Sequence, residues 1–530
     1  MDDLKKVIRG DVDVSTAARR AYSHDASIFE VTPTAIIYPK NTTDLKKLVH
    51  YITDRKLEGA DVSIAPRNGG TCMSGGSLTE GYMVDMSRYF NHVGAVDVAG
   101  KKLWVQGGVM HIDAEKRAYQ SGLFFAPYTS SRDICGIGGM IGNNASGEKS
   151  VKYGPTSANV DNLKVVLSDG EEYDFGPLTA REVEHKKQLP TFEGKLYREV
   201  TKLIEDNWNL IDQKHPHTIK NASGYALWEL WDKQQSHFNM ARLFVGAQGT
   251  LGFVTEAELK LVPLPKASRM LVVPITELSE LTDVVKTIMK FHPVTCETFD
   301  HHTYELAEKY HPEDAERAHL ARGKHMVVLA VFDGDSQEAS DRVTFEAKQA
   351  VEKLGREVLW VDDQQVLESF LLIRRKSFRM LLEHPHDDMR AMAFLEDTIV
   401  PLEHYGQFLA SLEAILSEYD LIYTYAGHIG DGSIRLVPLI NMEKEGSAEL
   451  VMELETKVND LVMAFGGSIS VDHNDGLIRT PYLEQFFGPE MYTLFAEIKN
   501  LFDPLGIFNP GKKLGGSFEY TKDHIVKTNK

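Results

Sequence analysis

The stretch PYTSSRDICGIGGMIGNNASGEKSVKYG, residues 127–154, is the feature that most constrains the fold of this chain. Five glycines fall between positions 136 and 147. An ordinary turn needs one or two glycines, because only its positions with a positive φ favour glycine over other residues. The higher density indicates backbone that packs closely against a flat or extended ligand. Asparagine and serine side chains in the same stretch supply groups that can hydrogen-bond such a ligand.

A second glycine-rich stretch, APRNGGTCMSGG at residues 65–76, follows a strand-like run. Consecutive backbone N–H groups in such a bend can form a concave anion site, and Arg67 adds a positive charge. The stretch lacks the Gly-Lys-Ser/Thr ending of a Walker loop and the spacing of a Rossmann fingerprint. An ordinary loop is the alternative interpretation. A third stretch, GAQGTLGFVTE at 246–256, repeats the small-residue composition beside strands.

Length and composition restrict the class of protein. The 530 residues exceed one ordinary domain, and the formal net charge of −19 disfavours binding to nucleic-acid phosphates. No apolar run approaches the ~20 residues that span a bilayer, and no signal peptide is recognisable, so we expect no transmembrane segment. The three cysteines form neither a disulfide framework nor an iron–sulfur ligand cluster. We expect a cytoplasmic protein, with peripheral attachment to a membrane as the alternative.

Hydrophobic patterns divide the chain into three parts. Strand-like runs alternate with glycine-rich turns up to the Pro-Leu-Pro sequence at 263–265. Strand-like runs then alternate with helix-like runs, which indicates an α+β or α/β unit. We therefore predict an α+β protein with domains at 1–265 and 266–465, followed by a C-terminal segment at 466–530.

Two further stretches place histidine beside aspartate in glycine-rich bends. The first is TYAGHIGDGSIR at 424–435, which contains His428. The second is GGSISVDHNDGL at 466–477, which contains His473. Such a bend can be a metal site, a proton-transfer site or only a tight turn. Two of them in one chain favour a functional site over two structural turns.

The three glycine-rich stretches together resemble the flavin-contacting segments of FAD-linked oxidoreductases of the vanillyl-alcohol-oxidase, or PCMH-type, superfamily. The similarity covers roughly residues 20–515 and points to the branch of D-lactate dehydrogenase, glycolate oxidase and D-2-hydroxyglutarate dehydrogenase. It implies a two-part FAD-binding domain, an α/β cap domain with an antiparallel sheet, and a helical C-terminal segment that returns to the flavin. The loop around Arg67 lacks the histidine that links flavin covalently in some members, so the resemblance implies non-covalent FAD.

The resemblance also implies which residues contact FAD. The 65–76 stretch would hold the pyrophosphate, and the other stretches would line the rest of the cofactor. The candidate cofactor-binding residues are Arg67, Asn68, Gly69, Gly70, Thr71, Ser130, Gly138, Gly139, Gly142, Asn143, Asn144, Ser146, Gly249, Val254, Asn509 and Lys512. The last two come from the closing segment at 498–514, where a cation near flavin N1 would stabilise the reduced cofactor.

The two histidine bends resemble a divalent-metal motif of the family, but this chain departs from that motif. Arg435 stands where the motif has a second histidine, and Asp472 takes the place of a glutamate. His428, Asp472 and His473 are the candidate ligands of a metal such as zinc or manganese, since three protein ligands suffice for catalytic zinc. The alternative is that Arg435 replaces the ion and binds the carboxylate of the substrate.

The resemblance predicts FAD-dependent oxidation of a 2-hydroxy acid, of D configuration, with hydride transfer to flavin N5. We assign His473 as the base that takes the hydroxyl proton, with His428 as the second choice. Arg374, in the helix-like run FLLIRRKSFRML, is assigned to the substrate carboxylate, with a solvated basic helix face as the alternative. Electrons would pass to a separate acceptor, which is an iron–sulfur protein, a quinone or an electron-transfer flavoprotein.

Two other functions are alternatives. One is a non-redox flavin enzyme resembling alkyl-dihydroxyacetone-phosphate synthase. The other is an electron-transfer protein that binds FAD but has no substrate site. The sequence does not decide which hydroxy acid is oxidised, which acceptor is used, or whether the chain forms a homo-oligomer.

Overall fold

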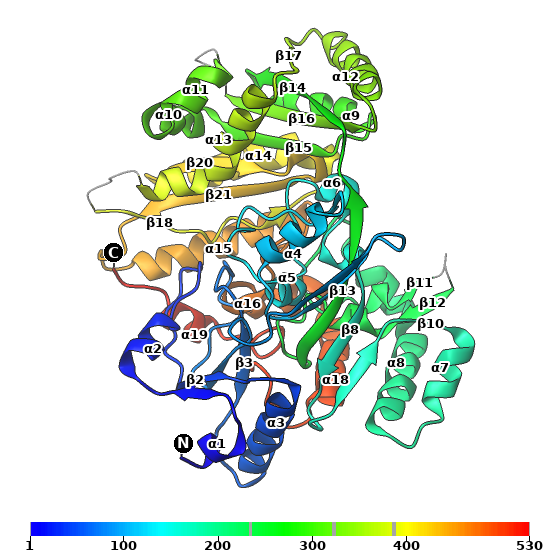
Figure 1. Cartoon of the computed structure of the whole chain (residues 1–530). Coiled ribbons are helices and arrows are strands. Elements are labelled where there is room, and N and C mark those ends of the chain that lie inside the picture. The colour runs from blue at the N-terminus through cyan, green and yellow to red at the C-terminus, as the bar shows by residue number, and fades with distance from the viewer. Residues whose placement is uncertain (1, 233–235, 321–324, 384–387, 529–530) are drawn as a thin grey trace.

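A computed structural model describes residues 2–232, 236–320, 325–383 and 388–528 of the chain (Figure 1). The described residues form four β-sheets with helices packed around them. In the view of Figure 1, an N-terminal sheet lies at the bottom, a six-stranded sheet in the middle and an eight-stranded sheet at the top. This mixture of helices and largely antiparallel sheets confirms the predicted α+β class.

The N-terminal sheet has the strand order β1-β2-β4-β3. Its strands are β1 (Asp11–Asp13), β2 (Ala35–Tyr38), β4 (Tyr82–Asp85) and β3 (Ile64–Arg67). Helix α3 (Thr42–Leu57) follows β2 and begins where the Asn41 side chain accepts a hydrogen bond from the Asp44 backbone N–H at 3.1 Å. Its apolar residues recur at helical spacing and pack against the sheet. The packing of this sheet therefore fixes strand β3 and, with it, the start of the 65–76 stretch.

The six-stranded sheet is antiparallel and forms the middle of the molecule. Its strands are β5 (Val93–Asp97), β6 (Lys102–Gln106), β13 (Phe253–Pro263), β8 (Val160–Val166), β9 (Glu172–Phe175) and β7 (Leu123–Phe125). Helices α4 (His111–Tyr119), α5 (Ile137–Asn143) and α6 (Ser150–Tyr153) come from the insertions between these strands. Helices α7 (Ala180–Lys187) and α8 (Phe192–Lys214), with the short strands β10 (Pro177–Thr179), β11 (Trp231–Asp232) and β12 (His237–Asn239), complete this region.

The eight-stranded sheet is antiparallel throughout. Its strands are β17 (Leu359–Val361), β14 (Ala267–Ile275), β16 (Met326–Gly334), β15 (Thr295–Asp300), β20 (Ile422–Gly427), β21 (Ser433–Ile440), β18 (Arg390–Ala391) and β19 (Thr398–Ile399). Both faces are covered, since Met270 and Val272 lie in one hydrophobic core and Leu271 and Val273 lie in another. Alternate residues of a strand point to opposite faces, so β14 reads as a continuous apolar run.

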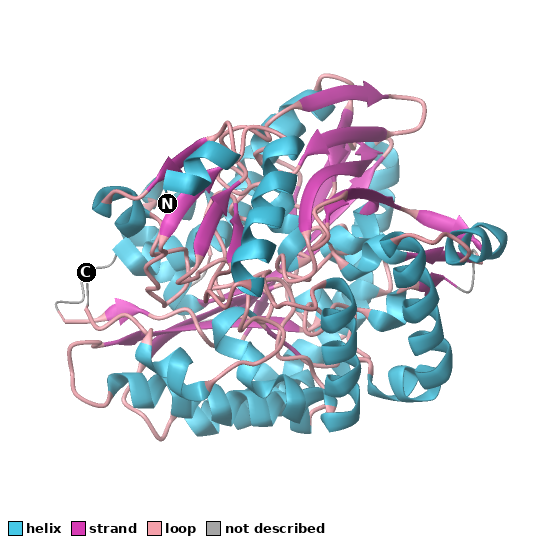
Figure 2. Cartoon of the chain, turned by 90° about the horizontal axis from the view of Figure 1, so that it is seen from below, coloured by secondary structure: helices cyan, strands magenta, loops and turns pink. Residues whose placement is uncertain are grey.

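Helices cover both faces of this sheet, and Figure 2 shows how helices pack around the strands of the molecule. The first face packs against α10 (His301–Tyr310), α11 (Pro312–Ala318) and α13 (Gln364–Glu383). The second packs against α9 (Leu281–Met289), α12 (Gln337–Glu352), α14 (Tyr405–Leu416) and α15 (Ser447–Ala464). The predicted boundary at 265 lies between β13 and β14, and the one at 465 follows α15. The division into domains stays a prediction.

The C-terminal part returns to the N-terminal half, as the resemblance implied. It contains α16 (Gly476–Arg479), α17 (Leu483–Phe487), α18 (Pro489–Phe502) and α19 (Phe518–Asp523). The Ile64 N–H donates to the Ile507 carbonyl at 2.8 Å, and the Asn509 N–H donates to the Ile64 carbonyl at 2.9 Å. These bonds join the closing segment to β3 beside the 65–76 stretch.

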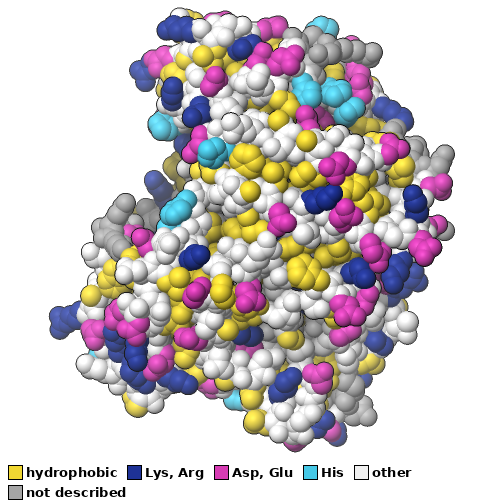
Figure 3. Space-filling view, turned by 180° about the vertical axis from the view of Figure 1, so that it is seen from behind, with side chains coloured by type: hydrophobic (Ala, Val, Ile, Leu, Met, Phe, Trp, Pro, Cys, Tyr) yellow, Lys and Arg dark blue, Asp and Glu magenta, His cyan; other side chains and the backbone are white. Residues whose placement is uncertain are grey.

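The exterior carries acidic and basic side chains with apolar ones scattered among them, as the rear face in Figure 3 shows. None of the helices in the described ranges combines the length and the apolar character needed to cross a membrane.

Candidate active site

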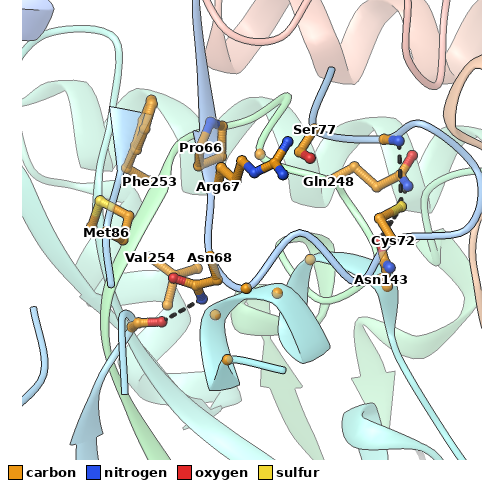
Figure 4. A pocket seen from close by; sticks show the side chains of 18 of the residues that line it. Pro66, Arg67, Asn68, Cys72, Ser77, Met86, Asn143, Gln248, Phe253 and Val254 are labelled. Carbon is orange, nitrogen blue, oxygen red and sulfur yellow. Dashed lines mark hydrogen bonds between the residues drawn. The ribbon is translucent and has the colours of Figure 1, made fainter. Parts of the chain in front are cut away.

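A cavity of about 840 Å³ lies where the three glycine-rich stretches meet. Figure 4 shows Asn68 and Val254 on one side of this space and Asn143 and Gln248 on the other. The stretches reach it from β3, from α5 and from the turn before β13. Eleven of the predicted cofactor residues line it, namely Arg67, Asn68, Gly69, Gly70, Thr71, Gly138, Gly139, Gly142, Asn143, Gly249 and Val254.

This space exists because the glycines that line it have no side chains to fill it. A Cβ atom added to Gly139 would meet nothing nearer than Asn68 at 3.7 Å, and one added to Gly142 would lie 3.7 Å from Gln248. Helix α5 thus turns bare backbone toward the cavity. Gly249 has a φ of +70°, and a Cβ there would lie 2.2 Å from Pro66, so only glycine fits this close approach.

Two buried polar atoms at the cavity wall lack partners within the described chain. They are Oδ1 of Asn68 and Oγ of Ser77. The amide Nδ2 of Asn68 donates to the Gly107 carbonyl at 2.8 Å, which fixes the direction of its oxygen. Unpaired buried polar groups are costly, so a polar ligand is expected to satisfy them. A long glycine-lined space with unpaired polar atoms fits FAD.

Five predicted cofactor residues lie outside this cavity. Ser130 and Ser146 line a second cavity. Asn144 is buried in the left-handed conformation and accepts from the Ser157 N–H at 2.8 Å. Asn509 donates to the carbonyls of Gly76 and Gln248, each at 2.7 Å. Lys512 donates to the Leu78 carbonyl at 2.6 Å, and burial lowers its pKa to about 8.

The second cavity, of about 2100 Å³, adjoins the first. Both are lined by Thr71, Gly139 and Asn143, so the two spaces meet along α5. The remaining wall comes from α13, β20, β21 and the loop before α16. The predicted catalytic and metal-binding residues all line it, namely Arg374, His428, Arg435, Asp472 and His473. The fold therefore brings together side chains that are far apart in the sequence.

His473 is held by a buried acid. Its Nδ1 is hydrogen-bonded to Oε2 of Glu396, which lies in the apolar run before β19. Arg479 binds the other oxygen of Glu396 at 3.1 Å. Burial opposes ionisation of Glu396, but His473 and Arg479 hold its pKa below the ordinary value. An ionised carboxylate only accepts, so in the neutral form of His473 the proton lies on Nδ1 and the lone pair on Nε2.

His428 lies between two acids. Its Nδ1 is 2.6 Å from Oε1 of Glu297, and its Nε2 is 3.4 Å from Oδ2 of Asp472. Burial disfavours the imidazolium, but Glu297 and Asp472 together raise the pKa of His428 above its ordinary value. Each ring nitrogen thus faces an acid, while the Arg435 guanidinium, 3.1 Å from Nε2, opposes the protonated ring.

Arg374 lies on α13 and its Nε is 2.9 Å from Oε2 of Glu297. The side chain is 8% exposed, and its Nη2 is buried with no hydrogen-bond partner among the described residues. Burial lowers the pKa of Arg374, yet a guanidinium stays charged at any working pH. The neighbouring Arg375 differs, since Glu148 binds it at 2.7 Å and 2.8 Å.

The cluster around Asp472 does not fit a divalent ion. Its Oδ1 is 3.0 Å from Nζ of Lys220, and its Oδ2 is 2.6 Å from Nη2 of Arg435. The same Nη2 lies 3.1 Å from Nε2 of His428. Arg435 therefore stands against two of the three predicted ligands and brings a permanent charge to the place of the ion.

A different trio has the spacing of metal ligands. Within the described ranges, it consists of Glu396, Asp397 and His473. Asp397 accepts from the backbone N–H groups of residues 471–473 and from a serine hydroxyl. Arg479 lies 3.1 Å from Glu396 and 3.6 Å from Asp397. These oxygens are already bound, so this trio does not offer an open metal site either.

Several residues of the site were not singled out from the sequence. They are Lys220, Glu297, Glu396, Asp397, Asp431 and Arg479. One signal was available, because the run AMAFLEDTIVP contains two acids in an otherwise apolar segment. Buried acids without an obvious partner indicate a paired or functional group.

Comparison with known proteins identifies two family matches. Residues 33–176 match the FAD binding domain, and residues 264–513 match the C-terminal domain of FAD linked oxidases. The crystal structure of p-cresol methylhydroxylase has a TM-score of 0.67 and 14% identity, and the match covers 95% of this chain and 93% of that chain. This likeness shows that the fold is PCMH-type.

Two relatives bear on the chemistry. D-2-hydroxyglutarate dehydrogenase of Pseudomonas putida is 30% identical over 519 residues, which cover 95% of this chain and 50% of that protein. Glycolate oxidase subunit GlcD of Bacillus subtilis is 28% identical over 506 residues, which cover 94% of this chain and 93% of that protein. The chain thus spans about half the length of the first relative, and of three further D-2-hydroxyglutarate dehydrogenases that it matches. With both family matches and the shared fold, the chain belongs to the FAD-linked oxidases and binds FAD.

Proposed function

We propose that the chain oxidises a 2-hydroxy acid, of D configuration, to the 2-oxo acid. Bound FAD supplies a hydride acceptor for this reaction. The observation that carries the proposal is that His473 and Arg374 line one cavity, which adjoins the cofactor cavity along α5. Removing hydride from a hydroxy acid needs a base for the hydroxyl proton and a cation for the carboxylate. The names of the two relatives support the same reaction class.

His473 is the proposed base. Its Nε2 lone pair is left free by the bond from Nδ1 to Glu396, and the side chain is 15% exposed along the cavity. Once Nε2 takes the hydroxyl proton, the imidazolium lies beside an ionised carboxylate, which stabilises it. Glu396 is a positioning residue in this scheme, because it fixes the tautomer and the ring orientation.

His428 is not suited to the same task. Glu297 engages Nδ1, and Asp472 and Arg435 both face Nε2, so neither nitrogen is free to accept the hydroxyl proton. We propose that His428 instead holds Glu297 and Asp472 in place. The sequence-based second choice for the base is therefore assigned a supporting role.

Arg374 is the proposed carboxylate anchor. Its Nη2 is buried and unpaired among the described residues, and Glu297 lies 2.9 Å from Nε as its ion-pair partner. A guanidinium held in this way can bind a carboxylate through parallel hydrogen bonds. Such bonds to charged groups contribute about 1.5–3 kcal/mol each. The alternative of a solvated basic helix face disagrees with the burial of Arg374.

The reduced cofactor must pass its electrons on, and we propose a separate acceptor. An iron–sulfur protein, a quinone and an electron-transfer flavoprotein are the three candidates. The relatives that are about twice as long as this chain carry additional sequence that this chain does not match.

The test is an anaerobic visible spectrum of the FAD-bound protein, titrated with D and L forms of 2-hydroxyglutarate and lactate and with glycolate. We expect one D acid to bleach the flavin band with a stoichiometry of one acid per FAD, and its L form to leave the band unchanged. If no hydroxy acid bleaches the flavin, the proposal fails. A non-redox flavin reaction or an electron-transfer role would then take its place.

A further inference from the structure

We infer that a fixed pair of side-chain cations, Lys220 and Arg435, replaces a divalent metal ion in this active site. The inference deepens the proposed function and rests on it. Each oxygen of the buried Asp472 carboxylate faces one of the two cations, Oδ1 at 3.0 Å and Oδ2 at 2.6 Å. The Ser146 hydroxyl also donates to Oδ1, and Nε2 of His428 faces Oδ2, so the lone-pair directions of this carboxylate are already taken.

Lys220 is an internal cation with every hydrogen occupied. Its side chain is 1% exposed, and its Nζ lies 2.8 Å from Asp431 and 3.0 Å from Asp472. The hydroxyls of Ser146 and Ser150 lie 2.9 Å and 3.2 Å from the same nitrogen. Lys220 thus forms ion pairs with two buried carboxylates. The ammonium is therefore a permanent part of the site.

Arg435 occupies the position that a metal would need. Its Nη2 is 3.1 Å from Nε2 of His428, while Nδ1 of that ring is taken by Glu297. An ion could reach His428 only by displacing the guanidinium. Arg435 cannot be deprotonated to make room, whereas a neutral imidazole at this position could ligate.

Charge balance leads to the same result. The acids Glu297, Asp431 and Asp472 each form an ion pair within the cluster. Their permanent cationic partners are Lys220, Arg374 and Arg435. Each of these three carboxylates therefore has a permanent side-chain cation beside it, so none of them is left to balance the charge of a divalent ion.

The pair also supplies what an ion would supply to the substrate. Arg435 keeps 18% of its side chain exposed, and it lines the same cavity as His473 and Arg374. Its remaining N–H groups can bind an oxygen of the hydroxy acid and stabilise negative charge as the proton leaves. Lys220 acts through Asp472, which it holds in the orientation that Arg435 requires.

The test measures metal content of the FAD-bound protein by elemental mass spectrometry, after purification without chelator and after dialysis against zinc or manganese. We expect far less than one metal atom per FAD in the natural chain. Stoichiometric metal that survives dialysis would overturn the inference. This measurement uses no substrate, so a failure of the proposed function would be seen separately in the flavin titration.

Two substitutions sharpen the result. Arg435→His removes the permanent charge and supplies a ligand beside His428, so we expect it to gain zinc at a level of one atom per FAD. Arg435→Gln removes the charge without supplying a strong ligand, and we expect it to bind far less zinc. Equal zinc binding by both variants and the natural chain would show that Arg435 does not decide metal occupancy, and the inference would fail.

Discussion

The two adjoining cavities are built in opposite ways. Bare backbone shapes the cofactor cavity, where Gly139 and Gly142 leave space that any side chain would fill. Charged side chains shape the substrate cavity, where His473, Arg374 and Arg435 are each held by a buried acid. The cofactor cavity is therefore expected to be sensitive to substitutions that add atoms. The substrate cavity is expected to be sensitive to substitutions that remove charged groups. Substitutions that respect this difference test it directly.

The largest effect is expected from adding atoms to the cofactor cavity. Gly139→Leu adds a side chain whose Cβ would meet, outside its own helix, only Asn68 within 4 Å. The variant should fold, because the leucine meets little of the protein, but it should lose FAD and with it every flavin-dependent reaction. Absorbance of the flavin band per protein, with circular dichroism to check folding, measures the outcome.

Gly406→Ala is the control for the loss of a helical glycine. Gly406 lies in α14, away from both cavities, and its added Cβ would lie 3.4 Å from Thr282. This variant should keep a full complement of FAD. A Gly139→Leu protein that retains its flavin would show that the cofactor does not lie against α5.

Removing the proposed base tests the second region. His473→Ala should slow anaerobic flavin reduction by ~10²–10⁴-fold, the usual contribution of a positioned base. FAD content should stay unchanged, since His473 does not line the cofactor cavity. Stopped-flow absorbance measures the rate, and His404→Ala, an exposed histidine before α14, serves as the control. An unchanged reduction rate in His473→Ala would remove this histidine from the chemistry.

A smaller effect, a loss of substrate affinity, is expected when the positive charge of Arg374 is kept but its parallel guanidinium donors are removed. Arg374→Lys retains a cation beside Glu297 and removes the parallel donors, so substrate should bind about 10- to 100-fold more weakly. The dissociation constant comes from the hyperbolic dependence of the reduction rate on acid concentration. Arg317→Lys is the control, since its side chain on α11 is 46% exposed, pairs with Glu313 and lines neither cavity. Equal effects of the two substitutions would contradict the assignment of Arg374.

The same contrast explains how far the sequence could predict the site. The cofactor cavity depends on residues that are close in the sequence, and a glycine requirement is visible in the residue type itself. Side-chain direction is not visible in this way. Asn143 lines the cavity, whereas the next residue, Asn144, turns away in a left-handed conformation and binds Ser157. The resemblance to the family predicted that both residues contact the cofactor.

The substrate cavity depends on pairs that are distant in the sequence. Glu297 lies in β15, where every residue is buried. The hydrophobic pattern of this strand therefore does not show that Glu297 pairs with Arg374 and His428. Lys220 and Asp472 come from different halves of the chain. Only the arrangement of strands and loops shows which acid meets which cation. The predicted histidines and arginines were brought together, but their partners could not be read from spacing.

The smallest effect tests whether buried acids behind the substrate cavity make this region pH-sensitive. Glu455, in α15, is buried near Arg479, and burial raises its pKa to about 7. Its ordinary value is 4.5, so the folded state holds the proton to higher pH than the unfolded state does. Native stability from this group is complete below the lower value and is lost as the pH rises through 7.

Glu455→Gln cannot ionise, so it should raise the unfolding temperature by a few degrees at pH 8 and leave it unchanged near pH 4. Each unit of pKa shift corresponds to about 1.4 kcal/mol of unfolding free energy. Thermal scans at the two pH values measure the difference, and Glu453→Gln is the control, because its side chain on the same helix is 53% exposed. Equal shifts for Glu455→Gln at both pH values would mean that Glu455 ionises freely in the folded protein. The buried acid in α15 would then not make this region pH-sensitive.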